Sequence, residues 1–198
     1  SDLRENFRWL VPAARADLAR RVVLVGAEST GKSTLAEALA KSLGTVWIPE
    51  HGRWYWEGRR HLSEQSWTTD EFRRIARAQR QLEGDLARGA SAAAVIADTD
   101  AMVTAVWHER YLGAPDPVLD AMAEESTPDL YLVCAPDFDW VQDGTRESQS
   151  HRQSMHESVV RRAESSGADV AVLTGSHQDR LEVALELIES LTRFPVLI

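Results

Sequence analysis

The chain has 198 residues, a formal net charge of −9 and 43% hydrophobic residues, which fits an ordinary globular domain with a full core. No apolar run reaches the length of a membrane span, and the first residues lack the basic start and apolar stretch of a secretory signal. The negative charge argues against general binding to nucleic acid, because such binding needs a surplus of lysine and arginine. The lone cysteine, Cys134, lies in an apolar run and is expected to be a buried, inert thiol in a reducing cytoplasm. Small molecules are therefore the expected ligands.

Residues 1–20 differ in pattern from the rest and are interpreted as a lead-in or linker remnant, which leaves residues 21–198 as the predicted domain. From Arg21 onward, short β-branched runs alternate with helical segments, as is typical of βαβ units and a parallel sheet. The runs are nearly continuous in apolar residues, which indicates strands covered on both faces. The sequence thus predicts an α/β fold of three layers, in which helices flank a five-stranded parallel sheet. The predicted strands are residues 22–25, 45–48, 94–97, 130–134 and 170–173.

Three predicted helices carry an apolar stripe at helical spacing. Residues 32–43 form the first, which ends at Gly44 as a C-terminal cap. The second follows a capping box made by Thr68 and Glu71, and the third covers residues 181–191. The opposite face of the second helix carries four arginines and is predicted to be solvated: Arg73, Arg74, Arg77 and Arg80.

The segment after the first strand, residues 26–33, matches G-x-x-x-x-G-K-[ST] at every fixed position and leads into a helix. Glycines let such a loop curl so that its backbone N–H groups converge on phosphate oxygens at a helix N-terminus. Lys32 is expected to reach the β/γ-phosphates, and the Ser33 hydroxyl to bind Mg²⁺. This motif predicts ATP or GTP binding. The expected nucleotide-binding residues are Gly26, Glu28, Ser29, Thr30, Gly31, Lys32, Ser33 and Thr34.

The chain is too short for the additional elements of a motor, so a small-molecule kinase or a compact switch is expected. The guanine-recognition motif N-K-x-D is absent, because the corresponding stretch reads Cys134-Ala135-Pro136-Asp137.

Acidic residues follow the second and third strands, at the edge where doubly wound folds bind ligands. Asp98 can hold the metal through water or accept the proton of an attacking hydroxyl. Asp100 can bind a sugar diol or cap the next helix. Glu50 is the rival general base, while Arg53 suits either a phosphate or carboxylate contact or a surface ion pair. His51 has no partner at metal-ligand spacing and is not expected to be a ligand.

The segment after the fourth strand, residues 138–146, can either close over the phosphates or form an ordinary surface loop. In the first case, Arg146 would stabilise charge in the transition state, and Trp140 would stack on an aromatic ligand. Six of the seven tryptophans lie between Trp47 and Trp140, which suits a substrate with a flat ring.

Together these motifs resemble the ribosylnicotinamide kinase domain of the NadR family, within the P-loop kinase superfamily. The matching pieces are, in order, the loop at residues 26–33, Glu50-His51-Gly52-Arg53, Ile96-Ala97-Asp98-Thr99-Asp100 and Trp140-Val141-Gln142-Asp143-Gly144-Thr145-Arg146. The resemblance runs from about Arg21 to the end of the chain, and residues 4–12 are similar to the connector that follows an adenylyltransferase domain in this family. The family often has an aromatic residue at the position of His51 and an acidic one at Gln142.

The resemblance implies a nucleoside-kinase-like fold and transfer of the γ-phosphoryl group of ATP to the 5′-hydroxyl of nicotinamide riboside, with Mg²⁺. It implies that Lys32, Asp98, Glu50 and Arg146 are catalytic and that Ser33 and Asp98 hold the metal. Substrate contacts are expected at Glu50, Arg53, Asp98, Asp100, Trp140 and Asp143, with Trp140 against the nicotinamide ring. NAD is considered as a feedback ligand, and an adenylyltransferase domain as a neighbour in the parent protein. The chain itself contains no H-x-G-H adenylyltransferase signature.

Two alternatives stay open at this point. The chain could phosphorylate another nucleoside or nucleotide. It could also be a regulatory module that senses NAD or ATP without turnover and reports to an attached domain through residues 1–20.

Overall fold

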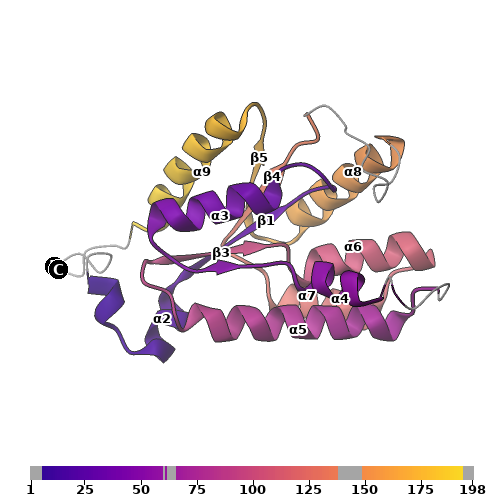
Figure 1. The fold of residues 1–198 in the computed structure, drawn as a ribbon, viewed down its shortest axis with the longest axis horizontal. Helices are drawn as coiled ribbons and strands as arrows, with labels where there is room; N and C mark the ends of the chain where they lie inside the picture. Colours follow the sequence, from indigo (N-terminus) through magenta and orange to yellow (C-terminus); the bar gives the residue numbers. More distant parts are fainter. Residues whose placement is uncertain (1–5, 60, 62–65, 138–148, 194–198) are drawn as a thin grey trace.

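A computed structural model describes residues 6–59, 61, 66–137 and 149–193 of the chain (Figure 1). Its centre is a five-stranded parallel sheet with the strand order β2-β3-β1-β4-β5. In this sheet Val23 of β1 lies opposite Ala97 of β3 and Tyr131 of β4. The strands are β1 (Arg20–Val25), β2 (Trp47–Ile48), β3 (Ala94–Asp98), β4 (Leu130–Cys134) and β5 (Asp169–Leu173).

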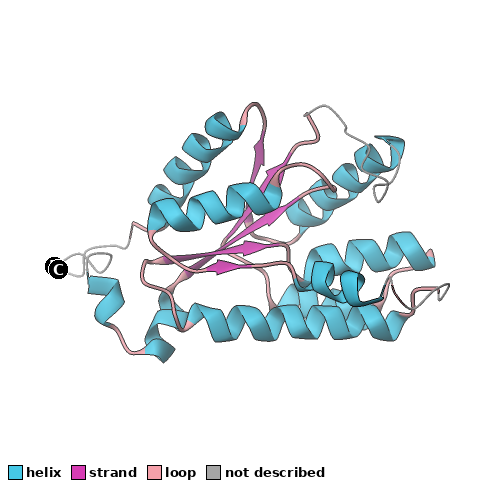
Figure 2. Cartoon of the chain, viewed as in Figure 1, coloured by secondary structure: helices cyan, strands magenta, loops and turns pink. Residues whose placement is uncertain are grey.

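Helices cover both faces of the sheet, which gives the three predicted layers (Figure 2). One face packs on α3 and α9 through Leu35, Leu39 and Ile188, and the other packs on α5, α6 and α8. The helices are α2 (Pro12–Leu18), α3 (Lys32–Leu43), α4 (His51–Arg59), α5 (Thr69–Ala87), α6 (Ala101–Leu112), α7 (Pro117–Glu125), α8 (Gln149–Ser165) and α9 (His177–Leu191). None of these described helices combines the length and apolar composition that a membrane span requires.

Local signals account for several element boundaries. The capping box predicted at Thr68 and Glu71 is confirmed at the start of α5, and Gly44 ends α3 in the left-handed conformation. The second strand is shorter than predicted, because the Thr45 N–H donates to Ala40 O at the end of α3 and so does not join the ladder.

Contacts between segments add to what the sequence predicts for the helices. Residues 51–53, which follow the second strand, begin helix α4, where the His51 N–H donates to the Gln79 side chain at 2.8 Å. On the predicted solvated arginine face, Arg74 and Arg77 are exposed, whereas Arg73 binds Asp116 of the α7 cap and Arg80 forms a surface ion pair with Glu125. Asp116 is the N-cap residue of α7, and Glu125 is the last residue of the same helix.

The lead-in packs on the domain core. A 3-10 turn, η1 (Phe7–Trp9), and helix α2 precede β1. The Phe7 side chain is fully buried in the same apolar cluster as Val23, and the Arg15 guanidinium donates to Ala90 O at 3.2 Å. The described part of residues 1–20 therefore contributes to the fold, and the division at residue 20 remains a prediction.

Candidate functional site

The phosphate-binding motif forms a tight loop between β1 and α3. Gly26 has φ of 142°, and a Cβ atom built there would lie 2.6 Å from Cys134 O on the neighbouring strand. Gly31 and Ser29 also have positive φ, at 80° and 58°. Only glycine adopts the Gly26 conformation at such a close approach without strain, so the first glycine of the motif sets the curl of the loop.

Lys32 folds back over this loop from the first turn of α3. Its Nζ donates to Ala27 O at 2.7 Å, and the Thr30 hydroxyl donates to the same oxygen at 2.9 Å. The ammonium group thus lies at the mouth of the loop, where a phosphate oxygen could replace the carbonyl as its partner.

A cavity of about 770 Å³ opens in front of the loop, which is within the size range of small-molecule sites. Residues of the loop form one wall, and residues at the carboxyl ends of β2 and β3 form the opposite one. The lining includes Gly26, Glu28, Ser29, Thr30, Gly31, Lys32, Ser33, Thr34, Glu50, Gly52, Arg53, Gln79 and Thr99. The sequence predicts twelve of these thirteen positions or their immediate neighbours, but gives no signal for Gln79, which reaches the cavity from the middle of α5.

Glu50 lines the cavity and interacts electrostatically with Lys32. Burial raises the pKa of the Glu50 carboxyl, while the Lys32 ammonium opposes this rise and the Asp98 carboxylate adds to it. The Arg53 guanidinium lies 4.0 Å from Glu50 Oε2 and is mostly exposed. Glu50 is thus a carboxylate of raised basicity beside a cation, a combination typical of functional sites.

Asp98 ends β3 and is almost completely buried. Among the described residues, its Oδ1 atom has no hydrogen-bond partner. The next residue, Thr99, lines the cavity and has φ of 65°, which is unusual for a β-branched residue. This strained turn places the two neighbouring carboxylates behind the cavity wall.

The diol contact expected for Asp100 is corrected by its surroundings. One carboxylate oxygen caps α6 by accepting the Val103 N–H at 3.2 Å, and the other accepts the Tyr131 hydroxyl at 2.6 Å. Both oxygens are used inside the protein and the side chain is buried, so the contacts favour the capping alternative.

The donor set fits a magnesium ion at the loop. Mg²⁺ prefers oxygen ligands and usually takes one or two of them from the protein and the rest from phosphates and water. Ser33 lines the cavity, and Asp98 has the unpartnered buried oxygen described above. No group of three or more histidine, cysteine, aspartate or glutamate side chains suited to a metal occurs in the described parts of the chain, so a metal here would depend on phosphate oxygens.

The end of the cavity away from the loop is aromatic. The Trp67 ring stacks on Trp56 with centroids 6.2 Å apart, and Tyr111 stacks on Trp107 at 5.7 Å. Phe72 joins them, and all five rings line the cavity. Trp140, which is predicted to stack on an aromatic ligand, lies outside the described residues together with Asp143 and Arg146.

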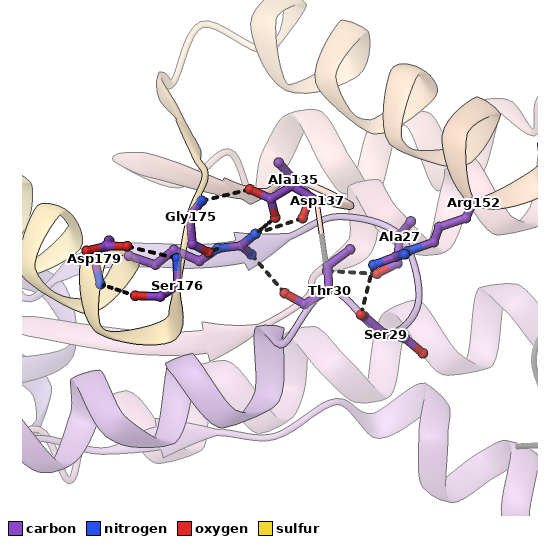
Figure 3. Close-up of polar contacts among 10 residues, drawn as sticks. Ala27, Ser29, Thr30, Ala135, Asp137, Arg152, Gly175, Ser176 and Asp179 are labelled. Atoms are coloured by element: carbon purple, nitrogen blue, oxygen red, sulfur yellow. Dashed lines mark hydrogen bonds and ion pairs between the residues drawn. The ribbon is translucent and has the colours of Figure 1, made fainter. Parts of the chain in front are cut away.

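Two arginines hold the phosphate-binding loop, and the sequence gives no signal for the second of them, Arg180. Arg152 of α8 donates to Ser29 O at 3.1 Å, and Arg180 of α9 donates to Thr30 O at 2.9 Å (Figure 3). The inert character expected of Cys134 is supported, because the thiol is completely buried and burial raises its pKa.

Comparisons with known proteins agree with this architecture. The family model described as AAA domain (AAA_28) matches residues 21–180, and the chain belongs to this family. Curated relatives include the trifunctional NAD biosynthesis/regulator protein NadR of Salmonella typhimurium and that of Escherichia coli, each 29% identical over 150 residues. These matches cover 74% of this chain and 36% of each relative, so the chain spans about a third of the length of these relatives.

Three solved structures share the fold. NadR protein in complex with NR has a TM-score of 0.74 at 24% identity, covering 91% of this chain and 54% of that one. NadR protein in complex with NAD and AMP-PNP has a TM-score of 0.74 at 23% identity, covering 98% and 56%. Thymidylate kinase from Ehrlichia chaffeensis has a TM-score of 0.59 at 18% identity, covering 87% and 98%. At these identities the likeness shows the fold.

Proposed function

We propose that this member of the AAA domain family transfers the terminal phosphoryl group of ATP to the 5′-hydroxyl of nicotinamide riboside, giving nicotinamide mononucleotide. The observation that carries the proposal is that one cavity joins the phosphate-binding loop, the Glu50 carboxylate and the aromatic end. The two NadR structures, one described with NR and one with NAD and AMP-PNP, support the same pairing of ligands.

The loop supplies the binding site for the triphosphate. Its backbone N–H groups and the start of α3 provide positive partial charge, and the Lys32 ammonium can exchange Ala27 O for a phosphate oxygen. Ser33 and Asp98 would hold Mg²⁺, which neutralises charge on the phosphates when it is bound. Arg146 remains a prediction for the charge that develops during transfer.

A carboxylate at the cavity supplies the proton acceptor. Glu50 lines the cavity and has a raised pKa, which favours proton transfer from an alcohol near neutral pH. Asp98 is the alternative acceptor, although it is buried and is not among the residues that line the cavity. We favour Glu50 as the base and Asp98 as the metal ligand, with Arg53 steadying Glu50 or a substrate oxygen.

The aromatic end suits the nicotinamide ring. This ring is flat and cationic in the riboside, and the faces of tryptophan and tyrosine attract cations. Trp56, Trp107 and Tyr111 line the cavity with such rings, whereas the Arg59 guanidinium already lies 4.3 Å from the centroid of the Trp67 ring. An uncharged nucleoside would gain stacking here but not the cation–π attraction, so the cavity favours nicotinamide riboside among nucleosides. Trp140 and Asp143 remain predicted contacts.

The proposal is tested by incubating the chain with ATP, Mg²⁺ and nicotinamide riboside and following the product by mass spectrometry. Nicotinamide mononucleotide should accumulate in step with ADP, and the Lys32→Ala variant serves as the inactive control. A panel of uncharged nucleosides measures specificity, and faster turnover of any of them would replace the substrate. Binding of NAD or ATP without a phosphorylated product would instead favour a sensing module.

The proposal extends to the protein of which this domain is expected to be a part. The NadR relatives are about three times as long as the matched segment, and from the resemblance to this family we infer an attached adenylyltransferase domain and a cytoplasmic location. One NadR structure is described with NAD, which supports NAD as a feedback ligand. Each of these needs the full-length protein for its test.

A further inference from the structure

We propose that Arg180 is a positioning residue that sets the orientation of the phosphate-binding loop, an inference that rests on the proposed function. Arg180 lies in the first turn of α9, about 150 residues after the loop in sequence, and its side chain is 2% exposed. None of the nucleotide-binding motifs includes this position.

The Arg180 guanidinium joins three loops at the carboxyl edge of the sheet (Figure 3). It donates to Thr30 O of the phosphate-binding loop at 2.9 Å, to Ala135 O after β4 at 3.0 Å and to Gly175 O after β5 at 3.1 Å. Its charge is matched by the Asp137 carboxylate, which also accepts the Gly175 N–H at 2.7 Å. A planar fork with five donors can make all these bonds at once, whereas a lysine cannot.

The bond to Thr30 O has a direct consequence for the loop amides. In a trans peptide the C=O of one residue and the N–H of the next point in opposite directions. Fixing Thr30 O against Arg180 therefore turns the Gly31 N–H to the opposite side of the peptide, away from the protein interior that holds the guanidinium.

The same logic applies to the preceding peptides of the loop. Arg152 holds Ser29 O at 3.1 Å, and Lys32 with the Thr30 hydroxyl holds Ala27 O. Side-chain donors thus hold three loop carbonyls, and the next amides, at Glu28, Thr30 and Gly31, are left to face the other way. The loop is preorganised for an anion before one arrives, which is the arrangement that gives the largest electrostatic stabilisation.

The Arg180→Lys variant tests this role, because it keeps the charge and loses the fork. Arg162→Lys is the matched control: this arginine also bridges two elements, through Glu109 and Asp120, but lies away from the loop. Binding of ATP with Mg²⁺ and of nicotinamide riboside is measured separately by calorimetry, together with KM and kcat. For Arg180→Lys we expect ATP affinity to fall by roughly 10- to 100-fold, the range for one lost hydrogen bond to a charged group. Affinity for nicotinamide riboside should stay within about 2-fold of the wild type.

A loss of affinity for ATP without a loss of affinity for nicotinamide riboside distinguishes a positioning role from a role in general stability. A purely structural role would lower the fraction of folded enzyme and thus kcat, while KM for ATP stayed unchanged; this result would overturn the proposal. If Arg180→Lys fails to fold, Asp137→Asn keeps the guanidinium but loosens its anchor and should still weaken ATP binding several-fold. Unchanged ATP affinity in that variant would also overturn it. Failure of the wild type to bind ATP would instead refute the proposed function itself.

Discussion

Replacing Glu50 by glutamine is the most direct test of how the cavity would perform phosphoryl transfer. The change keeps the shape of a partly buried side chain next to Lys32 and Arg53 but removes its ability to accept a proton. A positioned general base contributes roughly 10²- to 10⁴-fold in rate, or about 3–5.5 kcal/mol in the barrier. We therefore expect kcat with nicotinamide riboside to fall by at least about 100-fold.

The pH profile adds a second signature. Burial raises the pKa of Glu50 above its usual value of 4.5, and the base works only in its deprotonated form. As the pH falls, activity of the wild type should therefore begin to decline at a higher pH than an ordinary glutamate with a pKa of 4.5 would cause. The residual activity of Glu50→Gln should lack this decline, because no carboxylate remains to titrate at that position.

The assay compares kcat of Glu50→Gln and Asp98→Asn at saturating ATP and nicotinamide riboside, with product measured by mass spectrometry. Glu37→Gln is the matched control, since Glu37 is exposed on α3 and does not line the cavity. Asp98→Asn should respond to added Mg²⁺, because its proposed role is to hold the metal. If Glu50→Gln keeps the wild-type rate and acidic decline while Asp98→Asn loses both, the assignment of the base to Glu50 is refuted.

Three other substitutions test separate parts of the structure. Lys32→Ala should lower kcat by roughly 10²- to 10³-fold without unfolding the chain, and near-normal formation of nicotinamide mononucleotide would contradict the role given to the loop. Burial raises the pKa of Glu83 from 4.5 to about 7, so its contribution to the free energy of unfolding is fully present below pH 4.5 and is lost as the pH rises to about 7. Relative to Glu83→Gln, the free energy of unfolding of the wild type should therefore fall by up to about 3 kcal/mol between about pH 5 and about pH 8, as measured by urea unfolding. The same pH dependence in both proteins would refute this prediction. Phe7→Ala should lower the free energy of unfolding by about 3–5 kcal/mol, whereas Trp9→Ala, at a side chain 74% exposed, should change it by less than about 0.5 kcal/mol; equal effects would mean that the lead-in does not pack on the core.

The sheet and the phosphate-binding loop could be predicted from sequence because their signals are local. The runs within β1, β3 and β4 are nearly continuous in apolar residues, and this pattern is typical of a parallel strand that is covered on both faces. The loop is identifiable because Gly26 has no room for a side chain, so the chemistry fixes the residue type.

The rest of the site depends on contacts between segments that are distant in sequence. Gln79 holds the start of α4 through His51, and no pattern in α5 marks that glutamine as different from its neighbours. Asp100 shows a related limit: a carboxylate after a strand fits both a ligand and a cap, and only the position of the Tyr131 hydroxyl separates the two. The aromatic end likewise forms from rings on α4, α5 and α6 and from Trp67, which the sequence cannot place together.

The uneven use of basic residues has a physical explanation at the site. The chain has 22 lysine and arginine residues, of which only Lys32 and Lys41 are lysines. Where a cation must fix several backbone carbonyls in one geometry, as at Arg180, the planar fork is the suitable group. In the proposed reaction, Lys32 exchanges Ala27 O for a phosphate oxygen, and a compact, rotatable charge suits this exchange. Exchanging the two types, as in Arg180→Lys, should therefore impair the loop in spite of the conserved charge.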